Sequence, residues 1–341
     1  MQAVVLVDKG RLEHQNRPIP DPQPGQILIK THLAGICGSD VHAFHGLQPS
    51  LRYPCIMGHE LVGIVETVRG VSSLTPGQRV VIDPSFRCGT CLQCRDGKEN
   101  ICENLEVLGV HCNGGFAEYF VCDCSMVYPI PDSMADETAV MAEPLSIACH
   151  AADRIIGNAD TALIIGAGPI GLALLLFIRS RYRKILVLEP LENRRKSACL
   201  YGADLVLNPL DYAEEDIESV VRDLFGEMPG IVFDAVSNSA SAFLAETLVK
   251  RGGEVIIIGL ANTQTGFRLL PILKKELTIR GTRMTGKNTF PRVIDFMKGQ
   301  NREIWKPFIS HIYPLDQFEK GFDMAEHHPD LSIKVVIQCA K

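Results

Sequence analysis

Four closely spaced cysteines form the first group of residues that could do chemistry. They are Cys88, Cys91, Cys94 and Cys102, in the spacing C-x2-C-x2-C-x7-C. Four thiolates can surround one tetrahedral Zn²⁺ and leave it no open position, which is typical of a structural metal site. One alternative is an iron–sulfur cluster, although the fourth cysteine lies too far along for the ferredoxin pattern and no proline follows it. The other is a set of thiols without metal, and the spacing favours structural zinc.

A second group is dispersed along the chain and offers both sulfur and nitrogen ligands. Cys37, His59 and a carboxylate would give three protein ligands of mixed type, leaving the fourth position of a zinc ion for water or substrate. One thiolate and one carboxylate cancel the double positive charge of zinc, and Asp40 is placed to accept the second ring N–H of His59. Taken one at a time, Cys37, His59 and Glu143 also fit ordinary structural roles.

A glycine-rich motif follows an apolar segment near the middle of the chain. Residues 161–171 read TALIIGAGPIG, which is GxGxxG directly after a predicted strand and at the start of a predicted helix. In such a turn Gly166 permits the bend, Gly168 lets a pyrophosphate approach backbone N–H groups, and Gly171 allows close packing. Glu189 ends the next predicted strand, where an acid bonds the ribose hydroxyls of NAD and repels a 2′-phosphate. The alternative is a glycine-rich turn that binds nothing.

The elements that must position these groups change in character along the chain. Up to about residue 145, short β-like runs alternate with turn clusters, which predicts an irregular antiparallel β domain. Over residues 161–281, apolar strand candidates alternate with helical segments, which predicts a parallel sheet covered by helices on both faces. We therefore predict an α/β protein with one domain at residues 1–147, a second at 148–285, and a return to the first domain at 286–341.

Length and composition limit the class of protein. A chain of 341 residues, 46% of them apolar and 22% charged, fits an ordinary globular protein of about two domains. A net charge of −6 without a block of Lys or Arg argues against a nucleic-acid partner. The start has no signal-peptide pattern, and glycines interrupt the uncharged stretch 161–178, so neither export nor a membrane span is expected. Twelve cysteines without an export signal predict a reducing compartment, the cytoplasm.

The three motifs, in this order, make the chain similar to the zinc-dependent medium-chain alcohol dehydrogenases, in their sorbitol and threonine dehydrogenase branch. The resemblance covers essentially the whole length. It implies a GroES-like β catalytic domain and a doubly wound Rossmann domain, with the active site in the cleft between them. Arg69 and Gln78 depart from the family's turn patterns, but neither is a ligand. Residues 108–111 and 114–119 further resemble the L-galactonate oxidoreductase-like and starvation-sensing subgroup.

The resemblance also implies roles for individual residues. Cys37, His59 and Glu143 would be the catalytic zinc ligands, with Glu60 as an outer or alternate ligand. The four-cysteine group would be the structural lobe, which gives two zinc ions per chain. Ser39 and His42 would form a proton relay. The NAD site would comprise Gly166, Gly168, Pro169, Ile170, Gly171, Glu189 and Arg194.

These assignments predict the reversible oxidation of a secondary alcohol to a ketone, with hydride transfer to NAD. By resemblance, the favoured substrates are polyols, sugar acids or inositol-like rings, and the enzyme is a homodimer or homotetramer. An L-threonine 3-dehydrogenase-like activity on amino alcohols is the alternative, as is a cofactor-binding sensor without turnover. Four residues near the relay, the zinc histidine or the returning segment are candidates for the substrate pocket. They are Phe44, Arg52, His111 and Arg283.

Overall fold

The protein consists of two compact units. The computed structural model describes residues 1–70, 72–260 and 265–340. The first unit combines Met1–Ser146 with Met284–Lys341, and the second is the continuous stretch Ile147–Arg283. Two residues that are in contact in the first unit can therefore be separated in the sequence by the whole of the second unit.

The first unit is built on a mainly antiparallel sheet. Its strands are Gln26–Gly35 (β3), Glu60–Val68 (β4), Arg79–Ile82 (β5), Tyr119–Asp123 (β8), Val127–Pro129 (β9), Ile309–Pro314 (β16) and Lys334–Gln338 (β17). In the described residues they pair in the order β16-β17-β3-β4-β5-β9, and β8 also pairs with β3. Only the β16–β17 pair is parallel among these strands. Two smaller antiparallel pairs join Gln2–Asp8 (β1) to Arg11–Asn16 (β2) and Ser85–Phe86 (β6) to Glu106–Val107 (β7).

β3 is the central strand of this sheet. Its β-branched residues Ile27 and Ile29 are fully buried in the core of the first unit, as suits a pleated surface covered by other side chains. The antiparallel register sets Gly35, at the end of β3, opposite Glu60 at the start of β4. On the other edge Val336 of β17 pairs with the same Gly35. The end of β3 and the start of β4 therefore meet at Glu60, a residue of the predicted metal site, and β17 pairs with the same end of β3.

The helices of the first unit are short. They are Gly38–Phe44 (α1), Leu92–Arg95 (α2), Asp136–Ala139 (α3), Thr289–Lys298 (α10) and Phe318–His327 (α11). Ala142–Ala152 (α4) crosses from the first unit into the second. α11 packs on β16, β17 and α1, where the ring centroids of Phe44 and Phe322 are 5.1 Å apart. This packing fixes α1, the helix that follows β3 and carries Ser39 and His42.

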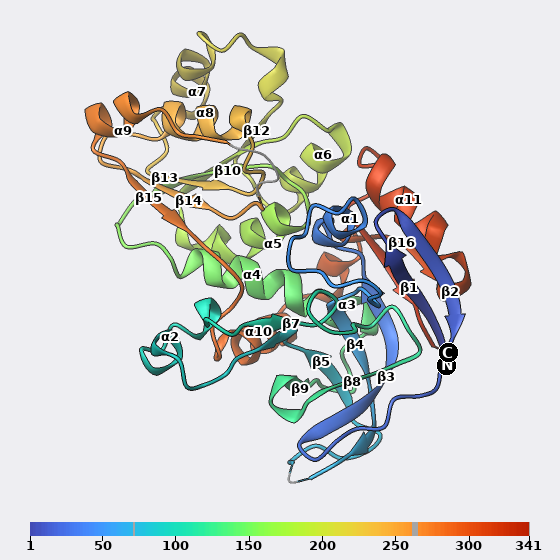
Figure 1. Ribbon diagram of the computed structural model, residues 1–341. Coiled ribbons are helices and arrows are strands. Elements are labelled where there is room, and N and C mark those ends of the chain that lie inside the picture. The colour runs from blue at the N-terminus through green and yellow to red at the C-terminus, as the bar shows by residue number, and fades with distance from the viewer. Residues whose placement is uncertain (71, 261–264, 341) are drawn as a thin grey trace. The chain divides into compact units, whose positions relative to one another are not determined.

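The second unit is a parallel sheet between two layers of helices (Figure 1). Its strands are Thr161–Ile165 (β10), Lys184–Leu188 (β11), Leu205–Leu207 (β12), Ile231–Asp234 (β13), Glu254–Ile257 (β14) and Thr278–Gly281 (β15). Its helices are Pro169–Ile178 (α5), Glu192–Leu200 (α6), Ile217–Phe225 (α7), Ser239–Leu248 (α8) and Leu269–Lys275 (α9). The described strands follow the order β12-β11-β10-β13-β14-β15, so the direction of winding reverses between β10 and β13. Open α/β sheets bind ligands at such a switch point, and the predicted doubly wound sheet is confirmed.

The uncharged stretch 161–178 contains two elements rather than one. It forms β10 and α5, and the glycine motif makes the turn between them. Throughout the part of the chain that the structure describes, no helix combines the length and apolarity that a bilayer crossing requires.

Candidate active site

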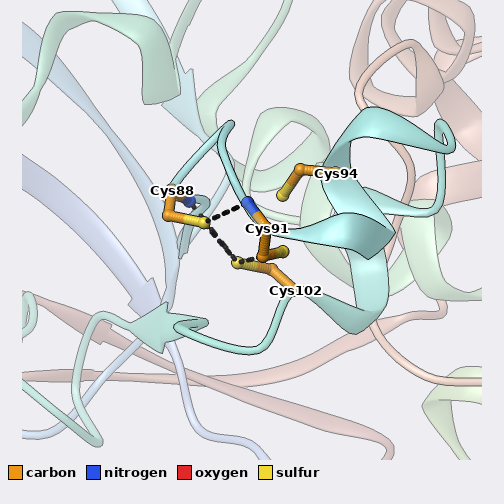
Figure 2. Close-up of side chains that lie close together, drawn as sticks. All are labelled: Cys88, Cys91, Cys94 and Cys102. Carbon is orange, nitrogen blue, oxygen red and sulfur yellow. Dashed lines mark hydrogen bonds between the residues drawn. The ribbon is translucent and has the colours of Figure 1, made fainter.

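The four cysteines of the first group lie together around α2, as Figure 2 shows. Their sulfur atoms all lie within 4.8 Å of one another, and those of Cys88 and Cys102 are 3.4 Å apart. Sulfurs at about 2.3 Å from a central zinc ion would be about 3.8 Å apart, so the cluster fits one tetrahedral ion. It is too compact for four thiolates that each bind a different iron of a cluster. Backbone N–H groups of Thr90 and Cys91 lower the pKa of Cys88 to about 5, whereas burial raises the pKa of Cys94 to about 12.

The second group gathers where β3, α1 and β4 meet. Ligand atoms of Cys37, His59 and Glu60 lie within 4.8 Å of one another. Cys37 lies between β3 and α1, and Glu60 begins β4 directly after His59. The set offers one thiolate, one imidazole and one carboxylate, which is the mixed donor set of an open zinc site. These residues therefore fit a catalytic zinc ion.

Two residues of α1 hold the ring of His59 from opposite sides. The Oδ1 atom of Asp40 lies 3.6 Å from Nδ1 of His59, and the Ser39 hydroxyl lies 3.5 Å from Nε2. The other oxygen of Asp40 accepts the backbone N–H of Cys37 at 2.9 Å, so one carboxylate orients both the thiol loop and the imidazole. Burial acts to lower the pKa of His59, but the nearby Asp40 and Cys37 raise it well above its usual value.

Glu143 was the predicted third ligand and lies beside this group. It belongs to the first turn of α4 and is buried. It is absent from the three residues whose ligand atoms lie within 4.8 Å of one another. Burial raises the pKa of Glu143 to about 7, with Glu60 adding to the rise and His59 and Lys334 opposing it. The geometry favours Glu60 as the carboxylate ligand, and a ligand role for Glu143 stays a prediction.

One residue of the group was missed by sequence reasoning. The ammonium of Lys334 donates to both carboxylate oxygens of Glu60, at 2.6 and 2.7 Å. The sequence does contain a sign of such a residue, because the apolar strand β17 begins with a lysine, Lys334. The sequence alone does not say which carboxylate such a lysine faces.

The glycine motif forms the turn that opens α5. Gly166 has φ of +89°, the left-handed region in which glycine is the ordinary residue. A Cβ atom on Gly171 would overlap the carbonyl oxygen of Gly166, so only glycine lets the helix approach the turn this closely. α5 starts after Gly168 with Pro169 in its first turn. The first N–H groups of a helix have no partner within it, which suits an anion at this end.

Glu189 follows β11 and is 3% exposed. Its carboxylate accepts the backbone N–H groups of Ala167 at 2.6 Å and Leu191 at 2.9 Å, so it joins the glycine turn to the turn after β11. Arg194 of α6 covers the same turn, because a Cβ atom on Gly168 would lie 3.5 Å from its Nη1. Burial lowers the pKa of Arg194, while the charge of Glu189 opposes that shift.

The four candidates for the substrate pocket have different surroundings. Phe44 packs against Phe322 at the edge of the first unit's core. Arg52 is exposed, and His111 accepts a backbone N–H of its own turn at 3.0 Å through Nδ1. Arg283 is exposed at the end of the second unit. Their role in binding substrate stays a prediction.

Comparison with known proteins defines the class of this one. Residues 23–132 match the family model of the alcohol dehydrogenase GroES-like domain, and residues 169–299 match that of the zinc-binding dehydrogenases. The chain belongs to the zinc-dependent medium-chain alcohol dehydrogenases, which are oxidoreductases. The predicted family and its combination of a GroES-like with a Rossmann domain are confirmed.

Several relatives match over nearly the whole chain. The starvation-sensing protein RspB of Escherichia coli is 32% identical over 99% of both chains. L-galactonate-5-dehydrogenase of E. coli is 32% identical over 95% of this chain and 94% of its own. Sorbitol dehydrogenase of sheep (Ovis aries) is 30% identical over 99% and 96%. A crystal structure of RspB from E. coli CFT073 in complex with NADH matches with a TM-score of 0.90, 31% identity and 99% coverage of both chains.

Proposed function

We propose that this protein is a zinc- and NAD-dependent dehydrogenase that oxidises a secondary alcohol group of a polyol or sugar acid to a ketone. The observation that carries the proposal is the cluster of Cys37, His59 and Glu60, whose donor atoms lie within 4.8 Å of one another. Such a set leaves one position of a tetrahedral ion open, unlike the four-cysteine lobe.

The cluster suits Zn²⁺ by charge as well as by donor type. One thiolate, one neutral imidazole and one carboxylate together cancel the charge of the ion. When bound, zinc supplies Lewis acidity that lowers the pKa of a substrate hydroxyl. Asp40 orients His59, as the 3.6 Å separation from Nδ1 supports, so that the other ring nitrogen remains available as a ligand.

Ser39 and His42 are the proposed path for the proton. They are three positions apart on α1 and therefore lie on one face of the helix. The Ser39 hydroxyl is 3.5 Å from Nε2 of His59 and therefore lies next to the proposed metal ligands. Burial, assisted by His45, lowers the pKa of His42, which keeps its ring neutral and able to accept a proton near neutral pH.

NAD is the proposed cofactor, and zinc the proposed metal in two sites per chain. The glycine turn and the buried carboxylate of Glu189 form the features that a dinucleotide needs after the first strand of a doubly wound sheet. Arg194, above Gly168, is close enough to the turn to contact the adenosine half of the cofactor. The bound NADH of the E. coli RspB structure supports this choice.

The substrate class rests on the relatives. Two of them are named for L-galactonate and sorbitol, a sugar acid and a polyol. We propose the same class here, with the enzyme in the cytoplasm as a homodimer or homotetramer. The twelve cysteines all lie in the part of the chain that the structure describes, and none of them is paired in a disulfide, in keeping with a reducing compartment. Three leucines of α9 are more than half exposed, a pattern that favours burial against another subunit.

The test is a substrate screen with the purified, zinc-loaded protein. NAD⁺ is offered with polyols, aldonates, inositols and amino alcohols, and the absorbance of the reduced cofactor is followed. At least one polyol or sugar acid should be oxidised, and the Cys37→Ala variant should not turn it over. Turnover of amino alcohols alone would replace the proposed substrate class, and no turnover with two metal ions bound would favour a sensor.

A further inference from the structure

Lys334 is a buried lysine that is not among the proposed ligands of either zinc ion or among the proposed cofactor-binding residues. Its side chain is 3% exposed, and that of its partner Glu60 is 1% exposed. The ammonium also donates to the carbonyl oxygen of Ile36 at 3.1 Å. With its two contacts to Glu60, all three donors of the ammonium are therefore used.

The carboxylate of Glu60 is confined from its other side by Gly35. A Cβ atom on Gly35 would overlap Oε2 of Glu60, so the carboxylate lies directly against bare backbone. The register that pairs Gly35 with Glu60 and with Val336, two residues after Lys334, brings these parts together. The position of the Glu60 carboxylate therefore depends on the ammonium of Lys334 and on the space that is left because residue 35 is a glycine.

The pair lies in a group rich in negative charge. The ligand atoms of Cys37 and Glu60 lie within 4.8 Å of each other. The buried Glu143 is close enough to interact electrostatically with Lys334. A buried ion pair is a poor source of stability, because desolvation offsets the attraction. Its place beside the metal ligands points to another role.

We propose that Lys334 is a positioning residue of the metal site, acting through Glu60. It holds both oxygens of that carboxylate and offsets its charge, so a divalent cation there is retained less tightly and stays more electrophilic than an unrestrained carboxylate would allow. The inference rests on the proposed function only in that Cys37, His59 and Glu60 hold the metal.

The experiment compares the full-length protein with Lys334→Met and Lys334→Arg. The matched control is Lys306→Met, since Lys306 and its partner Glu303 are both well exposed. Three quantities are measured: metal ions per chain, the rate of metal loss to a chelator, and the visible absorption spectrum of the Co²⁺-substituted protein. None of these depends on knowing the substrate.

Cys37, His59 and Glu60 are called the mixed site here. Lys334→Met should lose the metal of this site about tenfold more slowly and should shift the cobalt spectrum, because no ammonium then repels the ion or competes with it for Glu60. Lys334→Arg keeps the charge and should resemble the unmodified protein, as should Lys306→Met. An unchanged or faster loss with an unchanged spectrum would mean that the pair is merely structural, and would overturn the proposal.

If Lys334→Met does not fold, Lys334→Gln takes its place, because it keeps a hydrogen-bond donor for Glu60 and removes the charge. The same slower loss and shifted spectrum are expected, and their absence overturns the proposal. Two metal ions in the unmodified protein with no effect of these variants would refute the role of Lys334 alone. A single ion, held by the cysteine lobe, would refute the proposed function instead.

Discussion

Residues that do not bind the metal determine where the ligand atoms of the mixed site lie. Gly35 is the clearest case, since the space that its missing side chain leaves is filled by the carboxylate of Glu60. Lys334 holds the same carboxylate through both oxygens. At the scale of single residues, the site is therefore sensitive to changes that leave every metal ligand in place.

Gly35→Ala should disrupt the mixed metal site while leaving the fold intact. The new methyl group would displace the Glu60 carboxylate, so the second metal ion and about tenfold or more of the activity should be lost. Metal analysis, turnover and NADH binding are the measurements, and NADH binding should persist. Gly281→Ala is the control, because Gly281 also ends a strand but its Cβ would meet nothing within 4 Å. Full metal content in Gly35→Ala would contradict this account.

Glu189→Ser should weaken the preference for NAD over NADP. Two like charges about 4 Å apart repel by about 4 kcal/mol at an effective dielectric near 20, which exceeds a typical arginine contact of about 1 kcal/mol. Without the carboxylate, a 2′-phosphate no longer meets a like charge and can be attracted by the guanidinium of Arg194, so NADP affinity should rise by about tenfold or more. The variant should also be less stable, since Ala167 loses a buried acceptor.

Titration of each variant with both cofactors measures this effect. Glu192→Ser is the control, because Glu192 lies on the same helix as Arg194, α6, and is an exposed residue that forms an ion pair with the exposed Lys196. If the unmodified protein had the same catalytic efficiency with NADP as with NAD, the role given to Glu189 would be refuted. The zinc assignments would not be affected by that result.

At the scale of elements, a single carboxylate ties a short helix to two strands of the first unit. Asp136 of α3 lies 2.9 Å from Nδ1 of His32 in β3 and forms an ion pair with Arg79 in β5. Burial acts to raise the pKa of Asp136, but hydrogen bonds from His32 and Arg79 outweigh it, and the pKa is lowered.

Asp136→Asn should destabilise the protein near neutral pH and progressively less in acid. A folded-state pKa below the ordinary 3.8 means that the carboxylate contributes its full stabilisation above pH 3.8. That contribution is lost as the pH falls through the lowered folded-state value. We expect a loss of about 1–3 kcal/mol at pH 7, read from melting curves at several pH values. Asp295→Asn, at an exposed pair, should show little change, and a pH-independent difference for Asp136→Asn would contradict the argument.

The cysteine lobe should respond to substitution differently from the mixed site. Cys91→Ser opens a closed thiolate site whose metal contributes folding free energy, so the melting temperature should fall along with one zinc ion per chain. Cys37→Ala should remove the other ion and the activity yet melt close to the unmodified protein. Cys199→Ser, at an exposed free thiol, is the control. If Cys91→Ser melted like the control, the lobe would not be a folding element.

At the scale of the whole molecule, the proposed metal and cofactor residues belong to different compact units. The mixed site and the cysteine lobe are in the first unit, whereas the glycine turn and Glu189 are in the second. The second unit has its own buried core, which includes Leu163, Leu186 and Val232.

The unmodified protein should contain two zinc ions per chain, and their removal by a chelator should leave NADH binding largely unchanged. Elemental analysis gives the stoichiometry, and cofactor fluorescence reports binding before and after chelation. One ion per chain together with iron would indicate a cluster in the cysteine lobe. Loss of NADH binding on chelation would show that the second unit depends on the metal of the first.

The parts predicted from sequence were those whose partners are close along the chain or fixed by a repeating pattern. The cysteine group folds within one loop, and the glycine turn is dictated by the strand and helix on either side of it. The position of Glu60, which the geometry favours over Glu143 as a ligand, depends on the register of β3 against β4, which no local pattern sets. Lys334 was missed because 274 positions separate it from Glu60. Phe44 was proposed for the pocket on sequence proximity to the relay, and its packing against α11 was not visible from its neighbours.

The split of the first unit has a consequence for the order of synthesis. Domains fold largely as units while the chain emerges from the ribosome. The second unit is continuous and can fold once residue 283 has emerged, but the first unit lacks β16, β17 and α11 at that moment. Cys37, His59 and Glu60 are by then present without the ammonium of Lys334 beside them. At that stage Glu60 lacks the ammonium that offsets its charge, so we expect an ion that reaches these three residues to be held more tightly than in the complete chain.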